Sequence, residues 1–173
     1  MAILRDATIA DLEQIQPIYA HHVMHGAASF EESPPDLAEM TARFQALKAK
    51  NMPYLAALED ERILGYAYAG PYRPRSAYRF TVEDSIYLAP DAAGKGLGRL
   101  LLAELVDRCT AMGMRQMIAV IGDSANVASI GLHRALGFAM IGTLPAIGFK
   151  FGRWIDSVLM QRALGEGSSS LPR

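Results

Sequence analysis

Apolar residues recur three to four positions apart in four stretches of the chain, which is the spacing of one face of a helix. The first stretch contains Pro17, so we expect a kink or a break within it. Asp36 precedes the second stretch and Glu39 follows three residues later, which is the pattern of a helix N-cap with a capping box. The predicted helices therefore begin at Thr8 or Asp11, at Asp36, at Leu97 and at Asn126.

Shorter apolar runs bounded by turn residues indicate strands. They cover residues 3–7, 54–59, 63–69, 79–88, 117–121, 138–144 and 154–160. We expect a hairpin at residues 60–62 and a polar, aromatic loop over 149–153. The order is one strand, two helices, three strands, a helix, a strand, a helix and two strands. It predicts an α/β fold in which helices cover both faces of a mixed sheet.

Length and composition favour one globular domain, expected over residues 1–164, with a flexible tail rich in glycine and serine over 165–173. The net charge of −1 offers no broad basic surface, so we expect no nucleic-acid partner. The first residues lack the long apolar core of a signal peptide, and no apolar run approaches about 18–20 residues, so we expect no membrane span. A lone cysteine, Cys109, allows no intrachain disulfide and favours a cytoplasmic protein.

A glycine-rich segment links the apolar run that ends at Leu88 to the third predicted helix. Gly94, Gly96 and Gly98 remove side chains where the backbone must turn and a ligand must come close. The helix that follows offers unpaired N–H groups and the positive end of its dipole, which together suit a phosphate. Its neighbours Lys95 and Arg99 add positive charge, so this segment predicts a diphosphate site.

Two common phosphate-binding motifs do not fit the segment. A Walker motif needs Ser or Thr after Gly-Lys, but Gly96 follows Lys95. A dinucleotide-binding fingerprint needs a third glycine three residues after the second, where this chain has Arg99.

The segment resembles the acetyl-CoA loop of the GNAT superfamily of N-acetyltransferases, with Gly96 and Gly98 at its glycine positions. Ala93 stands where that loop usually has Gln or Arg, a change that removes a side chain but no backbone donor. Residues 126–138 resemble a second GNAT signature. The resemblance covers nearly the whole chain and implies the GNAT fold, with a mixed, mostly antiparallel sheet and helices on both faces.

Three separate segments are more specifically similar to phosphinothricin acetyltransferases. They are residues 28–32, 81–87 and 149–154. These enzymes acetylate the α-amino group of phosphinothricin, methionine sulfoximine or methionine sulfone. The resemblance therefore implies an acetyl-CoA-dependent enzyme that acts on a small amino acid analogue, without a metal.

The resemblance also implies which residues hold acetyl-CoA. Backbone groups of Ile86, Tyr87 and Leu88 would pair with the pantetheine arm as an added strand does. In the superfamily, a bulge opens the slot beside this strand. The other expected contacts are Gly94, Lys95, Gly96, Leu97, Gly98, Arg99, Asn126, His133 and Ala135. Asn126 could equally be a simple helix cap, and His133, where many members have tyrosine, could protonate the leaving thiolate or simply line its helix.

Glu83 is the expected general base, because it lies on the strand that leads into the glycine loop. Its carboxylate would take the ammonium proton, directly or through water. From the strand pattern alone, it could also be a solvated surface charge. Asp84 should point to the opposite face by strand alternation, so we expect it to take no part.

The acceptor would carry a carboxylate and a second polar group. Candidate contacts are Phe30, Arg75, Ser76, Ala77, Tyr78, Arg79, Glu83 and Lys150. The two loop arginines could instead be plain surface charges. His21, His22 and His25 lack further ligands nearby, so we interpret them as solvated or capping residues rather than a metal site.

Alternatives to the leading function remain open. The same fold could acetylate a polyamine, a protein N-terminus or a lysine. A non-catalytic acyl-CoA-binding module would bind the coenzyme without releasing its thiol. Because the family is commonly dimeric, we expect a homodimer to which the aromatic residues of 149–154 contribute.

Overall fold

The computed structural model describes residues 2–172, and the elements within them follow the predicted order. Residues 1 and 173, which the predicted domain and tail include, lie outside the described residues. The strands are β1 (Ile3–Asp6), β2 (Tyr54–Glu59), β3 (Arg62–Pro71), β4 (Thr81–Leu88), β5 (Gln116–Gly122), β6 (Ala139–Lys150) and β7 (Arg153–Ala163). The α-helices are α1 (Leu12–His25), α2 (Leu37–Ala49), α3 (Leu97–Ala111) and α4 (Val127–Ala135), and short 3-10 turns are η1 (Ile9–Asp11), η2 (Ser76–Tyr78) and η3 (Pro90–Ala92).

Across residues 2–172, the strands form a seven-stranded sheet in the order β1-β2-β3-β4-β5-β7-β6. Neighbouring strands run antiparallel, except for the parallel pair β4–β5. This confirms the predicted mixed, mostly antiparallel α/β sheet.

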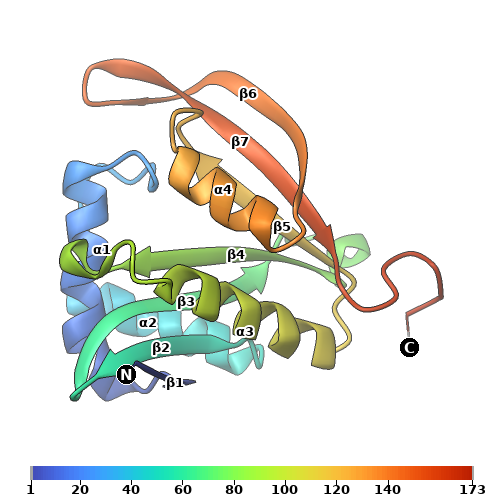
Figure 1. Ribbon diagram of the computed structural model, residues 1–173, viewed down its shortest axis with the longest axis horizontal. Coiled ribbons are helices and arrows are strands. Elements are labelled where there is room, and N and C mark those ends of the chain that lie inside the picture. Colours follow the sequence, from blue (N-terminus) through green and yellow to red (C-terminus); the bar gives the residue numbers. More distant parts are fainter. Residues whose placement is uncertain (1, 173) are drawn as a thin grey trace.

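Two hydrophobic layers hold the sheet between helices (Figure 1). Figure 1 shows α3 and α4 in front of the sheet and α2 behind it. On the α1–α2 side, Leu12, Ile15 and Phe44 pack against the sheet. On the α3 side, Leu101 and Leu105 are fully buried. Each such side chain contributes about 1.5–3 kcal/mol on burial, so the core fixes both faces of β4 firmly.

Two local expectations differ from the structure. Pro17 does not interrupt α1, because Ile15 and Ile18 on either side of it are both buried against the core. The predicted loop over 149–153 is mostly strand, because β6 runs to Lys150 and β7 begins at Arg153. Phe151 and Gly152, both with positive φ, form the two-residue turn that joins them.

Strands β4 and β5 diverge after a short paired segment. The pairing covers Thr81–Glu83 of β4 and Gln116–Ile118 of β5 and then stops, while both strands continue. The β3–β4 register shows no shift along its length, so the opening comes from the divergence of β5. The predicted slot is thus present, and Glu83 lies at its apex.

None of the helices in the described part of the chain combines the length and hydrophobicity that a membrane span requires. Beyond β7, Leu164 is buried, and Arg115 donates hydrogen bonds to the Gly167 carbonyl and the Ser170 hydroxyl.

Candidate active site

The diverging strands border a cleft of about 940 Å³. Glu83 lies where the paired segment ends, and Gly94, Gly96 and Arg99 line the cleft in the region of the glycine loop. Residues of β5, α4 and the α1–α2 loop complete the walls. The cleft therefore joins the predicted base to the predicted diphosphate site.

The glycine loop has the geometry of an anion site. Gly94 and Gly96 both have φ of 78°, a left-handed conformation that other residues rarely adopt. Gly96 is the N-cap of α3, and no side chain caps this helix end. The N–H groups of the first turn are therefore left for a ligand, and no side chain offsets the positive end of the helix dipole. The residues present fit a diphosphate.

Not every predicted contact of this site lines the cleft. Gly98 and Arg99 do, whereas Lys95 is exposed outside the lining. Leu97 is buried in the core beneath the loop, and Ala135 is exposed near the end of α4. Side-chain roles for Leu97 and Ala135 therefore find no support in the geometry.

The outer half of β4 lines the cleft through Ile86, Tyr87 and Leu88. His22 of α1 also lines the cleft, and its Nε2 lies 2.8 Å from the Leu88 carbonyl. Burial lowers the pKa of His22, which favours a neutral ring that donates to this carbonyl. His22 is therefore not the solvated or capping residue expected from the sequence, because helical periodicity does not reveal a distant backbone partner.

Asn126 combines both readings of its position. Its side-chain oxygen accepts a hydrogen bond from the Ser129 amide at 3.2 Å, which confirms the N-cap. The residue also lines the cleft, so its side-chain NH₂ can face a ligand.

Glu83 is half-buried at the apex of the slot, opposite Gly70 of β3 and Ile118 of β5. Within residues 2–172, no hydrogen bond or ion pair holds its carboxylate. Burial and the charge of Asp84 raise the pKa of Glu83, although Arg73 opposes them. A carboxylate whose pKa is raised toward neutrality is suited to accept a proton.

Asp84 faces the other side of the sheet as expected, but it is not a bystander. Its Oδ2 lies 2.9 Å from Nε2 of His133, and the exposed fractions of the two residues are 7% and 4%. His133 Nδ1 lies 2.7 Å from the Ser129 carbonyl oxygen. Strand alternation predicts a direction but not what lies there, so a residue expected to take no part is in fact half of a buried pair.

The α1–α2 loop covers the Glu83 face of the cleft and is clamped to the β6–β7 hairpin. A Cβ added to Gly148 would lie 2.5 Å from the Phe30 ring, so only glycine lets the ring rest there. Lys150 is 3% exposed, and its ammonium donates to the carbonyls of Gly26 and Ser29 at 2.8 and 2.7 Å. Phe30 thus lines the cleft, while Lys150 holds the loop in place.

The predicted acceptor loop lies at the rim. The side chains of Arg75, Ser76, Ala77, Tyr78 and Arg79 are exposed and outside the cleft lining. Its neighbour Arg73 instead acts electrostatically on Glu83. The sequence does not indicate this arginine, because the irregular loop has no periodicity from which to place its side chain.

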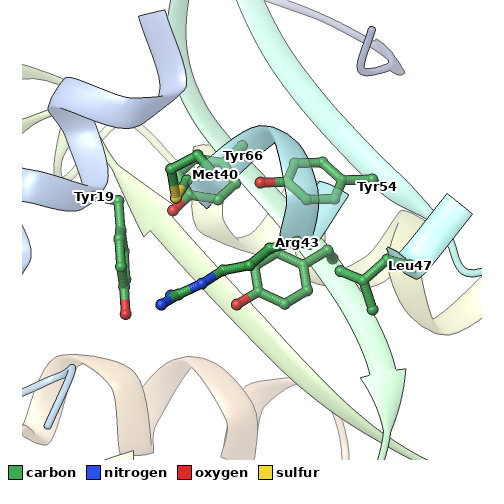
Figure 2. Close-up of a pocket in the computed structure, with 7 residues that line it drawn as sticks. Tyr19, Met40, Arg43, Leu47, Tyr54 and Tyr66 are labelled. Atoms are coloured by element: carbon green, nitrogen blue, oxygen red, sulfur yellow. The ribbon is translucent and has the colours of Figure 1, made fainter. Parts of the chain in front are cut away.

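A smaller pocket of about 40 Å³ lies on the α1–α2 side of the sheet (Figure 2). Figure 2 shows the Arg43 guanidinium extending toward Tyr19, beside the rings of Tyr54 and Tyr66. Tyr68 lines both this pocket and the cleft. The pocket has room for water but not for an amino acid. We therefore interpret it as a packing gap behind Tyr68 and not as a second binding site.

Within residues 2–172, no group of three His, Cys, Asp or Glu side chains could hold a metal ion. His21 and His25 do share a helix face, with ring centroids 4.8 Å apart.

The sequence matches the Acetyltransferase (GNAT) family over residues 15–138. It is 59% identical over 162 residues to a phosphinothricin N-acetyltransferase of Alcaligenes faecalis, covering 94% of this chain and 82% of the relative. It is 46% identical over 161 residues to an L-methionine sulfoximine/L-methionine sulfone acetyltransferase of Pseudomonas paraeruginosa, covering 92% and 93%. A crystal structure of a phosphinothricin acetyltransferase from Sinorhizobium meliloti with acetyl-CoA superimposes with a TM-score of 0.97 at 55% identity, covering 99% and 93%. The chain therefore belongs to the GNAT family of acetyltransferases.

Proposed function

We propose that this protein transfers the acetyl group of acetyl-CoA to the α-amino group of a small amino acid analogue of the phosphinothricin or methionine sulfoximine type. The observation that carries the proposal is one continuous cleft, with a proton-accepting carboxylate at the apex of the diverging strands and an uncapped helix end in its wall. The named activities of the similar proteins support the same class of acceptor.

The coenzyme would bind through the backbone. The amides of the first turn of α3 and the glycine loop would hold its diphosphate, with Arg99 adding charge. Beyond Glu83, β4 has lost its pairing with β5, so its free edge can bond an extended amide-containing arm. Ala93 leaves this set intact, because every donor named here, apart from Arg99, is a main-chain group.

The bound coenzyme supplies a thioester whose carbonyl carbon accepts the lone pair of the amine. Glu83 first binds the ammonium by charge and then takes one of its protons, which frees the lone pair. Backbone N–H groups near Ile86 can polarise the thioester oxygen. Because Glu83 is partly buried, few waters compete with the amine for its carboxylate.

On the acceptor side, we assign the nearest contacts to Phe30, Tyr68 and Glu83, which line the cleft. The exposed residues of 75–79 form a rim that would attract an anionic acceptor by its two arginines. Lys150 enters the proposal only through the loop that it holds.

A thiol-release assay with acetyl-CoA tests this function. The panel contains phosphinothricin, methionine sulfoximine, methionine sulfone, spermidine and a lysine-containing peptide. We expect release of CoA thiol with one or more of the amino acid analogues and the highest kcat/KM among them. A preference for spermidine or the peptide would refute the acceptor class, and acetyl-CoA binding without thiol release from any amine would refute catalysis.

We also propose that the chain forms a homodimer through the β6–β7 hairpin and acts in the cytoplasm. Ile147, Phe149 and Trp154 of the hairpin are more than half exposed, and Trp154 reaches 65%. A second copy offers the same apolar surface across a two-fold axis. Light scattering should give twice the mass of one chain, and Trp154→Glu should halve it; a monomeric wild type would refute the dimer.

A further inference from the structure

The buried pair of Asp84 and His133 is not used in the function proposed above. Both residues line the cleft, and Asp84 is adjacent in sequence to Glu83 at the apex. The pair belongs to the α3–α4 face of β4, whereas Glu83 faces the α1–α2 side. It therefore stands at the acyl end of the cleft, across the strand from the proposed base.

The hydrogen-bond partners of His133 indicate its protonation state. Nδ1 faces the Ser129 carbonyl, which can only accept, so this nitrogen carries a proton. Nε2 faces the Asp84 carboxylate at 2.9 Å, and when that group is ionised Nε2 must carry a proton as well. The ring is then an imidazolium held by acceptors at both ends.

A second feature of the pair is an unpaired carboxylate oxygen. Among the buried side-chain nitrogen and oxygen atoms of residues 2–172, Asp84 Oδ1 is the one without a hydrogen-bond partner. Burying a carboxylate oxygen without a hydrogen-bond donor costs free energy. An ion pair that served stability alone would gain nothing from leaving this oxygen unpaired. The charge is instead offset by the imidazolium, which the same carboxylate fixes in place.

We propose that Asp84 is a positioning residue that keeps His133 charged, so that a fixed imidazolium at the acyl end of the cleft offsets the negative charge that develops on sulfur. This inference rests on the proposed acetyl transfer. As the C–N bond forms, the C–S bond breaks and its electron pair leaves on sulfur. The nitrogen loses two protons overall: one goes through Glu83 to solvent, and the other balances the proton that the thiolate takes up from solvent.

The titratable and charged groups near the pair come from β4, α3 and β7. Burial alone would lower the pKa of His133, but the hydrogen bond and charge of Asp84, with the Ser129 carbonyl, raise it. Cys109 of α3 and Glu83 of β4 both feel the charge of Asp84. Burial first, and then Asp84, raise the pKa of Cys109 to about 12, so this thiol stays neutral. Arg162 of β7 is occupied by the Leu136 carbonyl.

The test is the pH profile of kcat for Asp84→Asn, measured with saturating acetyl-CoA and methionine sulfoximine. If the charged ring is required, the rate falls as pH rises through the pKa of His133. Removing the carboxylate charge should move this descending limb at least about one pH unit lower and reduce kcat at pH 8 by about tenfold. Asp107→Asn, on the exposed face of α3, removes the same charge elsewhere and serves as the matched control.

A limb that stays in place in Asp84→Asn would overturn the proposal, because a merely structural role does not shift a kinetic pKa. A second measurement needs no variant of Asp84 and no turnover. Ring ¹⁵N spectra of the wild type at pH 7, assigned by the signals lost in His133→Asn, should show both nitrogens protonated. An unprotonated Nε2 would overturn the proposal even if acetyl transfer occurs. If the ring is charged but no acetyl transfer is detected, the proposed reaction is refuted, together with the role at sulfur that depends on it.

Discussion

Two neighbouring carboxylates on β4 lie in opposite surroundings. Glu83 faces the α1–α2 side, is half-buried and is held by no hydrogen bond or ion pair within residues 2–172. Asp84 faces the α3–α4 side, is buried and is bonded to His133. Similar acidic groups one residue apart thus lie in different surroundings, because strand alternation sends them into different layers.

The difference follows from what each layer supplies. On the Glu83 side, the α1–α2 loop covers a cleft of about 940 Å³ that Glu83 itself lines, so the carboxylate remains accessible to an amine. On the Asp84 side, α4 delivers a ring whose charge compensates the burial. An unpaired carboxylate with a raised pKa can exchange protons, whereas a paired one holds a charge in place.

The largest effect should come from Glu83→Gln. The amide keeps the shape but cannot accept the ammonium proton, so kcat should fall by about 10²–10⁴-fold. Binding of acetyl-CoA should not change, and the free energy of unfolding should stay the same or rise slightly, because a half-buried unpaired charge is removed. Stopped-flow turnover, calorimetric titration and urea unfolding measure the three quantities. Near-normal turnover would remove Glu83 from the role of base.

Asp84→Asn should show the reverse pattern in stability. Weakening the buried pair should lower the free energy of unfolding by about 1–3 kcal/mol. Because the pKa of His133 is raised in the folded protein, the stabilisation is complete below the unfolded pKa and is lost as pH rises through the folded value. Urea unfolding from pH 6 to 9 should therefore show a decline in the wild type that is weaker in the variant. Parallel curves would argue against a charged pair.

A smaller effect, confined to the Glu83 side, is expected for Lys150→Met. The variant leaves the Gly26 and Ser29 carbonyls without their donor, at a cost of about 1–3 kcal/mol. The loosened loop should raise KM for the amine several-fold and leave the affinity for acetyl-CoA unchanged. Lys48→Met, at the exposed end of α2, is the matched control. An unchanged KM would show that the clamp does not shape the acceptor site.

The sequence carried the order of elements and the placement of Glu83, because both depend on local periodicity and on a local glycine pattern. It did not reveal the partner of Asp84, because His133 is 49 positions away and alternation predicts only a direction. The sequence also did not reveal the partners of Lys150, because this residue ends strand β6 instead of lying in a loop, and its ammonium bonds the Gly26 and Ser29 carbonyls more than 120 positions away. Long-range partners of polar residues depend on packing that no local pattern encodes.

The smallest effect should come from Arg73→Gln, which tunes the Glu83 side without touching its geometry. Burial and Asp84 raise the pKa of Glu83, and Arg73 opposes them, so loss of the arginine should raise this pKa further. Since the base must be ionised, the ascending limb of kcat/KM against pH should move to higher pH by a fraction of a unit, less in high salt because Arg73 is exposed. Arg62→Gln removes another exposed charge, which pairs with Asp91, and should leave the limb in place. A shift to lower pH in Arg73→Gln would mean that the titrating group is not Glu83.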